Sequence, residues 1–311
     1  MHRASLPPEL GDVFSVAHAR SLGVTASRLR ARDLGRPFPG VRVTPHASSQ
    51  GDRMPVERAL AYAHRMTEHQ FFMHATAALL WGLPLPPWLG ARAHVDVGVF
   101  SPRRTPVGTG VRGHAIREGS AHVALHPVHG VPVASPASVW AQLGAELRDL
   151  RDLVAVADAV VRVPLHDDDA PALATRDQLA AAMDAGRRVG IARLRDALPR
   201  VSERARSRPE TWLRLVVEDA GLPAPEVNFD VFEDGVWLAQ VDLAFPEARV
   251  ALEYEGEHHL TDPVQWAKDI ARYERLEAAG WCVLRVTKGD VFAAPGALIA
   301  RVRAALARAS G

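Results

Sequence analysis

Two adjacent segments that alternate between apolar and polar residues constrain the fold of this chain more than any other feature. The alternation runs over residues 237–245 and again over residues 250–255. This period of two predicts two β-strands. Pro246-Glu247-Ala248 separates the two segments and is short enough for a hairpin turn. The segments therefore predict an antiparallel pair of strands.

The predicted strands carry three acidic residues. Asp242 lies on the first strand, and Glu253 and Glu255 lie on the second. Because Glu253 and Glu255 are two residues apart, their side chains point to the same face of the sheet. Two carboxylates about 5 Å apart cost roughly 3 kcal/mol of repulsion at an effective dielectric constant of about 20. A cation, a shared proton or exposure to solvent must offset this repulsion.

An oxygen-rich cluster of this kind suits a hard divalent metal ion, so Mg²⁺ or Mn²⁺ is the expected cofactor. Gly256 ends the second strand, and His258 and His259 follow it closely. Both histidines are candidate site residues because imidazole nitrogens bind metals or accept protons. The alternative interpretation is a solvated polar face of an antiparallel hairpin.

Residues 205–295 resemble a known family in motif and in order. The motif is Asp, ten residues and Glu-x-Glu-Gly-x-x-His, followed by a predicted helix and by GWCVLRVT. It resembles domain-of-unknown-function family 559, which is similar to very-short-patch-repair endonucleases of the PD-(D/E)xK nuclease superfamily. The resemblance implies an α/β fold with a restriction-endonuclease-like core over residues 205–311.

The same resemblance implies a role for each acidic residue. Asp242 matches the first metal-binding acid of the superfamily, and Glu253 matches the second. Glu210, early in the preceding predicted helix, matches a helical glutamate that often contacts the metal through water. Glu255 stands where the superfamily usually has a catalytic lysine, and a carboxylate cannot act as that cation.

Other residues are candidates for the roles that Glu255 leaves open. The short-patch-repair enzymes also lack the lysine and use histidines near this position, which His258 or His259 matches. Glu255 itself, His258 or His259 is the expected general base. Lys268, one of two lysines in the chain, and Arg272, one helical turn further, are the expected cations for a phosphate group.

The N-terminal residues 11–49 predict two short helices and a small hairpin. VFSVAHARSLG is apolar at helical spacing, ASRLRARDLG follows with Thr25 as its N-cap, and PFPGVRVTPH forms the hairpin. Arg28, Arg30 and Arg32 fall in the second helix. This segment resembles the winged helix of AbiEi-type antitoxins, which implies DNA binding through these arginines. The alternative is an ordinary solvated arginine face.

The middle of the chain predicts a mixed α+β region. FFMHATAALLWGLPLP predicts a buried helix that begins at His74, and it resembles the second part of the antitoxin-like proteins. Residues 91–134 predict short strands. Four histidines fall within residues 114–129: His114, His122, His126 and His129. They favour strand or turn positions over a zinc site, because no cysteine accompanies them and their spacing is irregular.

Composition and charge narrow the possible functions. Hydrophobic residues make up 48% of the 311 residues, which is typical of a globular protein. The single cysteine excludes an internal disulfide and fits a reducing cytosol. No apolar stretch is long enough to span a membrane, and no secretory signal pattern is present. We therefore expect a cytoplasmic protein with no membrane partner.

Charge is unevenly distributed along the chain. Residues 205–311 hold 12 of the 37 basic residues and 17 of the 36 acidic residues. The positive charge that a DNA partner requires therefore lies mainly in residues 1–204. The expected domains are a winged-helix-like domain over 1–50, an α+β antitoxin-like region over 51–204 and a restriction-endonuclease-like domain over 205–311.

Two functions from different classes follow from these observations. The first is a metal-dependent DNA endonuclease that hydrolyses phosphodiester bonds in defence or DNA repair. The second is a non-catalytic, DNA-binding transcriptional regulator of the antitoxin type, with a degenerate nuclease fold and a cognate toxin or other protein partner. The set of Asp, Glu and His residues favours the first function, and the missing lysine favours the second.

Overall fold

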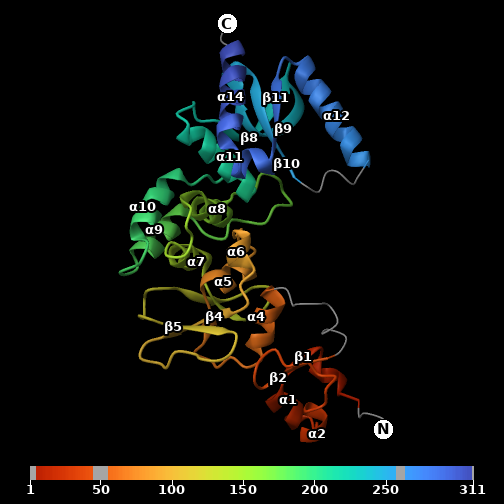
Figure 1. Ribbon diagram of the computed structural model, residues 1–311, viewed down its shortest axis with the longest axis vertical. Coiled ribbons are helices and arrows are strands. Elements are labelled where there is room, and N and C mark those ends of the chain that lie inside the picture. The colour runs from red at the N-terminus through yellow and green to blue at the C-terminus, as the bar shows by residue number, and fades with distance from the viewer. Residues whose placement is uncertain (1–4, 45–54, 257–262, 310–311) are drawn as a thin grey trace. The chain divides into compact units, whose positions relative to one another are not determined.

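The computed structural model describes residues 5–44, 55–256 and 263–309, with the side chains of residues 263–269 left out (Figure 1). The chain is a mixed α/β protein, which confirms the expected class. Its residues form two compact units, Met1–Leu147 with Arg176–Leu194 and Arg148–Thr175 with Arg195–Gly311. In the described part of the chain, no helix has both the length and the apolar character needed to cross a membrane.

The first unit begins with two short strands and two short helices. These are β1 (Val13–Ser15), α1 (Val16–Ser21), α2 (Ala26–Leu29) and β2 (Val41–Val43), and β1 pairs antiparallel with β2. Thr25 caps α2 as expected, because its side-chain oxygen accepts a hydrogen bond from the backbone N–H of Arg28. Phe14, Leu29 and Leu34 are buried and form the core of this segment.

Three expectations for this segment are wrong in detail. Val13–Ser15 form a strand rather than the start of a helix, because Phe14 is fully buried between two half-buried neighbours. The expected hairpin after residue 37 does not close on itself: β2 pairs with β1 and makes a single bridge to Gly35. The second helix ends at Leu29, so Arg30 is its C-cap residue and Arg32 lies beyond it.

The rest of the first unit is a five-stranded sheet with helices. Its strands run in the order β5-β4-β3-β7-β6. Their bounds are β3 (Phe71–Phe72), β4 (Val95–Phe100), β5 (Val111–Ile116), β6 (Val123–Leu125) and β7 (Pro132–Ala134). The helices are α4 (Pro55–Ala63), α5 (His74–Leu80), α6 (Pro87–Gly90), α7 (Pro136–Leu143) and α9 (Arg176–Asp184). Helix α5 begins at His74, as expected.

The second unit is built on a four-stranded sheet in the order β11-β10-β9-β8. The strands are β8 (Glu226–Glu233), β9 (Val236–Phe245), β10 (Val250–Glu255) and β11 (Cys282–Thr287). Strand β9 pairs antiparallel with both β8 and β10, whereas β10 pairs parallel with β11. The helices are α8 (Leu150–Val161), α11 (Arg208–Asp219), α12 (Pro263–Ala278), α13 (Lys288–Phe292) and α14 (Pro295–Ala309). Helix α10 (Ile191–Ala197) crosses the boundary between the units in sequence.

Helices cover both faces of this sheet (Figure 1). Leu243 and Leu252 pack on one face with residues of α11 and α14. Ala244 and Ala251 pack on the other face with Leu276 of α12. Because alternate residues of a strand point to opposite faces, the strand alternation in the sequence reflects these two cores. The expected hairpin is confirmed: residues 246–248 form a short turn between the antiparallel strands β9 and β10.

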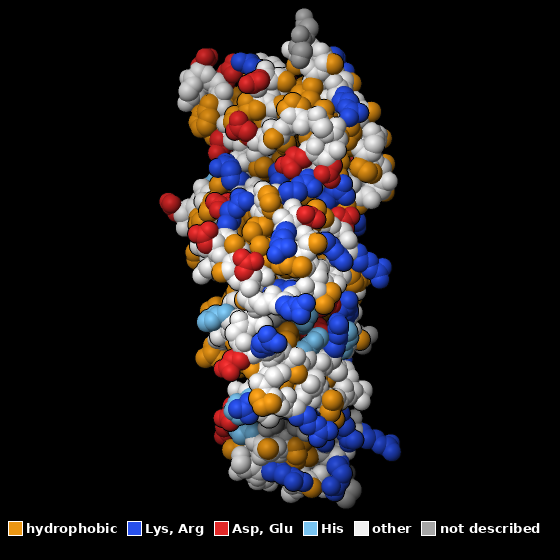
Figure 2. Space-filling view, turned by 90° about the vertical axis from the view of Figure 1, so that its left-hand side faces the viewer, with side chains coloured by type: hydrophobic (Ala, Val, Ile, Leu, Met, Phe, Trp, Pro, Cys, Tyr) orange, Lys and Arg blue, Asp and Glu red, His pale blue; other side chains and the backbone are white. Residues whose placement is uncertain are grey.

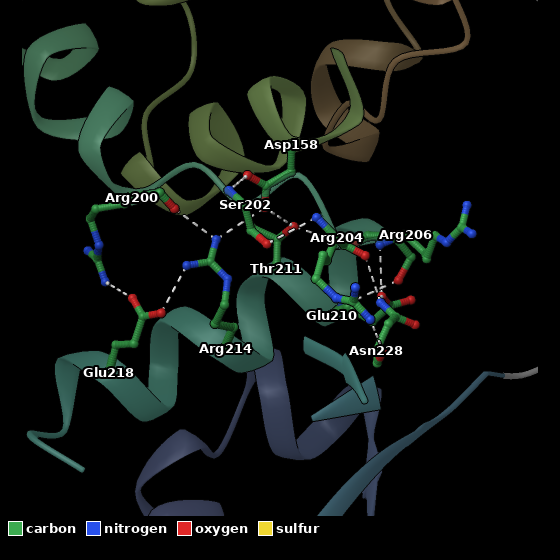
Figure 3. A network of polar contacts seen from close by, with 11 residues as sticks. Asp158, Arg200, Ser202, Arg204, Arg206, Glu210, Thr211, Arg214, Glu218 and Asn228 are labelled. Carbon is green, nitrogen blue, oxygen red and sulfur yellow. Dashed lines mark hydrogen bonds and ion pairs between the residues drawn. The ribbon is translucent and has the colours of Figure 1, made fainter. Parts of the chain in front are cut away.

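A buried polar network joins α8 to α11 (Figure 3). Asp158 of α8 accepts hydrogen bonds from Thr211 Oγ1 at 2.8 Å and from Arg214 Nη2 at 3.1 Å. The backbone N–H of Ser202 donates to the other oxygen of Asp158 at 2.7 Å. Residues 148–175 therefore belong to the second unit, although their sequence position places them in the expected middle region.

The ion pair between Asp158 and Arg214 should support the second unit strongly. Both side chains are almost fully buried, at 2% and 6% exposed. Burial raises the pKa of Asp158 to about 6 against the opposing effect of Arg214. Arg214→Met removes the cation and leaves a buried carboxylate, so we expect a loss of about 3–5 kcal/mol of unfolding free energy. Urea denaturation at pH 7.5 measures this loss.

Arg308→Met is the matched control, because Arg308 is an exposed arginine on α14. Its removal should change the unfolding free energy by less than about 1 kcal/mol. Equal losses for the two variants would mean that the network contributes no more than a surface arginine does.

Candidate functional site

The three acidic residues of the hairpin lie on the face of the sheet that α12 covers. Asp242 is two residues before Ala244, and Glu253 is two residues after Ala251, so both share the face of these alanines. Glu255 lies two residues further on the same strand. The three side chains are close enough for the charges of Asp242 and Glu255 to act on Glu253, as expected for acids on one sheet face.

Asp242 sits where the pairing of β9 with β10 ends. Strand β10 pairs with β9 from Val250 to Leu252, and its later residues pair with β11 but not with β9. There the backbone N–H of Tyr254 donates to Asp242 Oδ2 at 2.7 Å. The carboxylate thus replaces a backbone acceptor and is held close to β10.

Glu253 has an arginine as its counterion. Its side chain is 7% exposed, and Arg272 Nη1 donates to Glu253 Oε1 at 3.0 Å. The same guanidinium nitrogen lies 3.3 Å from the carbonyl oxygen of Gln240 on β9. Arg272 therefore bridges α12 to both strands that carry the acids.

Glu255 also has partners that the strand pattern does not indicate. Its Oε1 accepts hydrogen bonds from Tyr273 Oη at 2.9 Å and from Arg285 Nε at 2.7 Å. Burial and the hydrogen bond to Glu255 raise the pKa of the Tyr273 hydroxyl above its usual range. These contacts make Glu255 an anchor for α12 and β11, and no feature of the local sequence predicts them.

Glu210 enters the site from the first turn of α11 (Figure 3). Ser207 caps this helix by accepting a hydrogen bond from the backbone N–H of Glu210 at 3.3 Å. Glu210 Oε2 accepts from the backbone N–H of Arg206 at 2.8 Å and from Asn228 Nδ2 at 3.0 Å. Asn228 has a left-handed backbone conformation (φ 47°) and is 5% exposed. Asn228 thus combines an uncommon backbone conformation with a side-chain amide that donates to Glu210.

The charges of these acids act on one another. Burial is the largest cause that raises the pKa of both Asp242 and Glu253 well above the ordinary carboxyl range. The charge of Glu210 raises the pKa of Asp242 further, and the charge of Asp242 does the same for Glu253. Arg272 opposes both increases. The pair therefore retains a proton at a pH where isolated carboxyl groups are ionised.

The carboxylate oxygens of Asp242, Glu253 and Glu210 are candidate ligands for a divalent cation. Among the described residues, only one oxygen each of Asp242, Glu253 and Glu210 accepts a hydrogen bond. The second oxygen of each remains available, and Mg²⁺ commonly binds through one or two carboxylates while it keeps several waters. Within the described ranges, no group of three or more His, Cys, Asp or Glu side chains is arranged to hold a metal ion. The site thus fits a cation held by two carboxylates, in competition with Arg272.

Three expected site residues lie outside the described part of the site. His258 and His259 fall in residues 257–262, which the structure does not describe. Lys268 is part of α12, but its side chain is among those left out. Their expected roles therefore stay predictions.

The three N-terminal arginines differ in their surroundings. Arg28 donates through both terminal nitrogens to Asp33, at 3.1 and 3.0 Å, and its side chain is 11% exposed. Arg30 and Arg32 are exposed. The lower end of Figure 2, which carries the N-terminal segment, shows mainly Lys and Arg among its charged side chains. Two of the three expected DNA contacts thus face solvent, and Arg28 has a structural partner.

Comparisons with known proteins leave the activity open. No family model matches the chain, and no solved structure matches it. Two Mycobacterium tuberculosis proteins described as uncharacterized, Rv2248 of strain H37Rv and MT2308 of strain CDC 1551, are each 34% identical to it over 185 residues. The match covers 60% of this chain and 65% of each relative, so the chain spans less than two thirds of the relatives' length.

The raised pKa values predict how the stability of the second unit depends on pH. The folded state binds a proton at Asp242 and Glu253 that the unfolded state has already released, so unfolding free energy falls as pH rises. Asp242→Asn removes the contribution of Asp242 to this linkage and the part of the Glu253 contribution that comes from the charge of Asp242. Between pH 6.5 and 8.5 we expect the wild type to lose more stability than the variant, by up to about 1.4 kcal/mol per pH unit. Urea denaturation across this range measures the difference.

Glu247→Gln is the control for this measurement. Glu247 lies exposed in the turn between β9 and β10. Its substitution should leave the pH dependence of stability unchanged. A wild type and an Asp242→Asn variant with parallel pH profiles would contradict a shared proton in the acidic pair.

Proposed function

We propose that the second unit is a metal-dependent endonuclease domain that hydrolyses phosphodiester bonds of DNA. The observation that carries this proposal is the pair of carboxylates, Asp242 and Glu253, with raised pKa values beside Glu210. Strongly perturbed carboxyl groups that face each other are frequent at functional sites. A hard divalent cation is the ligand that relieves their repulsion most directly.

The order of elements supports the same proposal. Helix α11 precedes the antiparallel strands β8, β9 and β10, and α12 leads to the parallel strand β11. This is the order that the resemblance to the short-patch-repair endonucleases and to family 559 implies. Asp242, Glu253 and Glu210 occupy the elements that the resemblance assigns to the metal-binding acids. A restriction-endonuclease-like core is therefore the fold that we propose for this unit.

Each residue of the site has a separate role in the proposed reaction. Asp242 and Glu253 would hold Mg²⁺ or Mn²⁺, which would lower the pKa of a bound water and offset charge on the phosphate. Arg272, which contacts Glu253, lies where its guanidinium can transfer to a phosphate oxygen once a cation neutralises that carboxylate. Glu255 has two hydrogen-bond donors on one oxygen and orients α12 rather than accepting a proton. His258 or His259 is then the proposed general base.

A second function has a specific observation in its favour. Arg272 already neutralises Glu253, and Arg285 contacts Glu255, so positive charge is present at the acids without a metal. A scaffold that no longer cleaves DNA needs only this internal compensation. In that case the chain is a DNA-binding regulator of the antitoxin type, with a toxin or another protein as its partner.

Metal-dependent stability separates the two functions. Binding at 100 times the dissociation constant adds about 2.7 kcal/mol of unfolding free energy. If the second unit is the proposed endonuclease, Mg²⁺ or Mn²⁺ raises the melting temperature of the wild type, and the DNA in a mixture of DNA and RNA substrates is cleaved. Asp242→Asn should abolish both effects, because it removes one of the two carboxylates that hold the cation. Differential scanning fluorimetry and a gel assay of cleavage read the two effects.

Two further variants sharpen the comparison. Glu247→Gln, the exposed acid of the turn, should keep both effects. Arg272→Met should strengthen metal binding, because it removes the competing cation from Glu253, and should weaken cleavage. A wild type without any metal-dependent shift and without cleavage would sink the endonuclease proposal in favour of the regulator.

DNA binding through the N-terminal segment has its own test. Each phosphate contact contributes about 0.9 to the slope of log affinity against log salt concentration on duplex DNA. Replacing both exposed arginines, as Arg30→Met with Arg32→Met, should reduce this slope by about 1.8. Fluorescence anisotropy with duplex DNA measures the slope over a range of about 50 to 200 mM salt.

Arg28→Met is the matched control for the DNA measurement. Its guanidinium is committed to Asp33, so its loss should lower stability and leave the salt slope unchanged. If the double variant keeps the wild-type slope, the DNA contact lies elsewhere in the chain.

A further inference from the structure

The first unit contains a cavity of about 580 Å³ that is remote in sequence from the acidic site. The start of α5, helix α7 and the loops after β5 and α9 line it. Seven polar residues line it: His74, Arg117, Glu118, Ser120, Gln142, Arg187 and Arg188. A cavity of this size with a few convergent polar groups is typical of small-molecule sites.

His74 is oriented by a buried carboxylate. Its Nδ1 lies 2.5 Å from Oε1 of Glu146, whose side chain is 7% exposed. Arg92 and Arg112 contact the other oxygen of Glu146. Burial raises the pKa of Glu146, but its contacts with His74, Arg92 and Arg112 outweigh burial and hold the pKa at about 2. Glu146 is therefore ionised and fixes the ring with Nδ1 toward the carboxylate.

The backbone and ring of His74 are further constrained. Its φ of 51° is uncommon for a residue other than glycine. The ring stacks on His114 with centroids 4.4 Å apart, and Nε2 of His114 lies 2.9 Å from Asp96 Oδ1. Among the described residues, Nε2 of His74 has no hydrogen-bond partner. The ring therefore presents an unused nitrogen at a residue that lines the cavity.

Two other lining residues carry buried donors without partners. Gln142 is 7% exposed and accepts a hydrogen bond from the backbone N–H of His74 at 3.0 Å through Oε1, which leaves Nε2 buried and unpaired in the described structure. Arg188 donates to the carbonyl oxygen of Ser120, and its Nε is buried and unpaired among the described residues. Buried donors without acceptors are unfavourable, so a ligand with acceptor oxygens would satisfy them.

We propose that this cavity binds a phosphate ester, whose oxygens accept hydrogen bonds from Gln142, Arg188 and His74. Arginine guanidinium and imidazole N–H donors are well suited to a doubly charged phosphate group. Arg117 and Arg187 add positive charge at the exposed rim, where Glu118 is the acid among the lining residues. Met73, Ile116 and Ala141 supply an apolar wall for the organic part of the ester.

Titration calorimetry of the full chain tests the site. The probes are adenosine monophosphate and inorganic phosphate, each with EDTA present so that metal at the acidic pair does not contribute. Adenosine monophosphate should bind, and more tightly than inorganic phosphate because of the apolar wall. Arg188→Met and His74→Gln should each weaken binding by about tenfold or more, as expected for a lost charge-assisted contact.

Arg104→Met is the control, because Arg104 is exposed and does not line the cavity. It should bind the ester as the wild type does, and circular dichroism melting should show both test variants folded at the assay temperature. Failure of the wild type to bind either probe overturns the proposal. So does an equal loss of affinity in Arg104→Met, and equal affinity for the two probes overturns the ester assignment.

Discussion

Repulsion between the carboxyl groups of Asp242 and Glu253 is the constraint on which the second unit depends. Antiparallel pairing of β9 with β10 places both acids on one face of the sheet. An uncompensated buried charge costs several kcal/mol, so this arrangement requires a counterion or a proton. Arg272 supplies the counterion from α12, and Leu276, four residues later on the same helical face, packs on Ala244 and Ala251. Adjacent turns of α12 thus make an electrostatic contact and an apolar contact with the hairpin.

Glu210 adds a third negative charge that is held by a separate set of donors. The N-terminal end of α11 favours an acidic residue, because unpaired backbone N–H groups and the helix dipole are positive there. Arg204 donates to the carbonyl oxygens of Val227 and Asn228, and Asn228 Nδ2 in turn bonds the Arg204 carbonyl and Glu210 (Figure 3). The acids therefore lie on different elements, and any ligand that binds them ties α11 to the hairpin.

Local pattern was sufficient to predict the centre of this arrangement. Alternation identified the two strands, and residue parity placed Asp242, Glu253 and Glu255 on one face. The pattern could not predict Tyr273 and Arg285 as partners of Glu255, because these contacts depend on the rotation of α12 and on the register that sets Arg285 opposite Glu253. The local sequence also predicted Thr25 as a helix cap. It did not predict the strand at Val13–Ser15, because this strand pairs with residues 41–43, which lie far along the chain.

In the first unit, contacts between side chains that are far apart in sequence were the hardest feature to predict. His74 and Glu146 are separated by more than seventy positions, and neither lies in a motif that points to the other. The four histidines close together in sequence were expected at strand or turn positions rather than in a zinc site, and their spacing does not predict that His114 has Asp96 and the ring of His74 as its neighbours.

The balance of charge then distinguishes the two polar centres of the chain. At Asp242 and Glu253 the acids exceed the nearby cations, which raises carboxyl pKa values and favours a proton or a metal ion. At Glu146 two arginines and a histidine surround one carboxylate, which lowers its pKa and leaves donors in excess. Because a site attracts the charge that it lacks, the excess of acids at the first centre favours a cation, and the excess of donors at the second favours an anion.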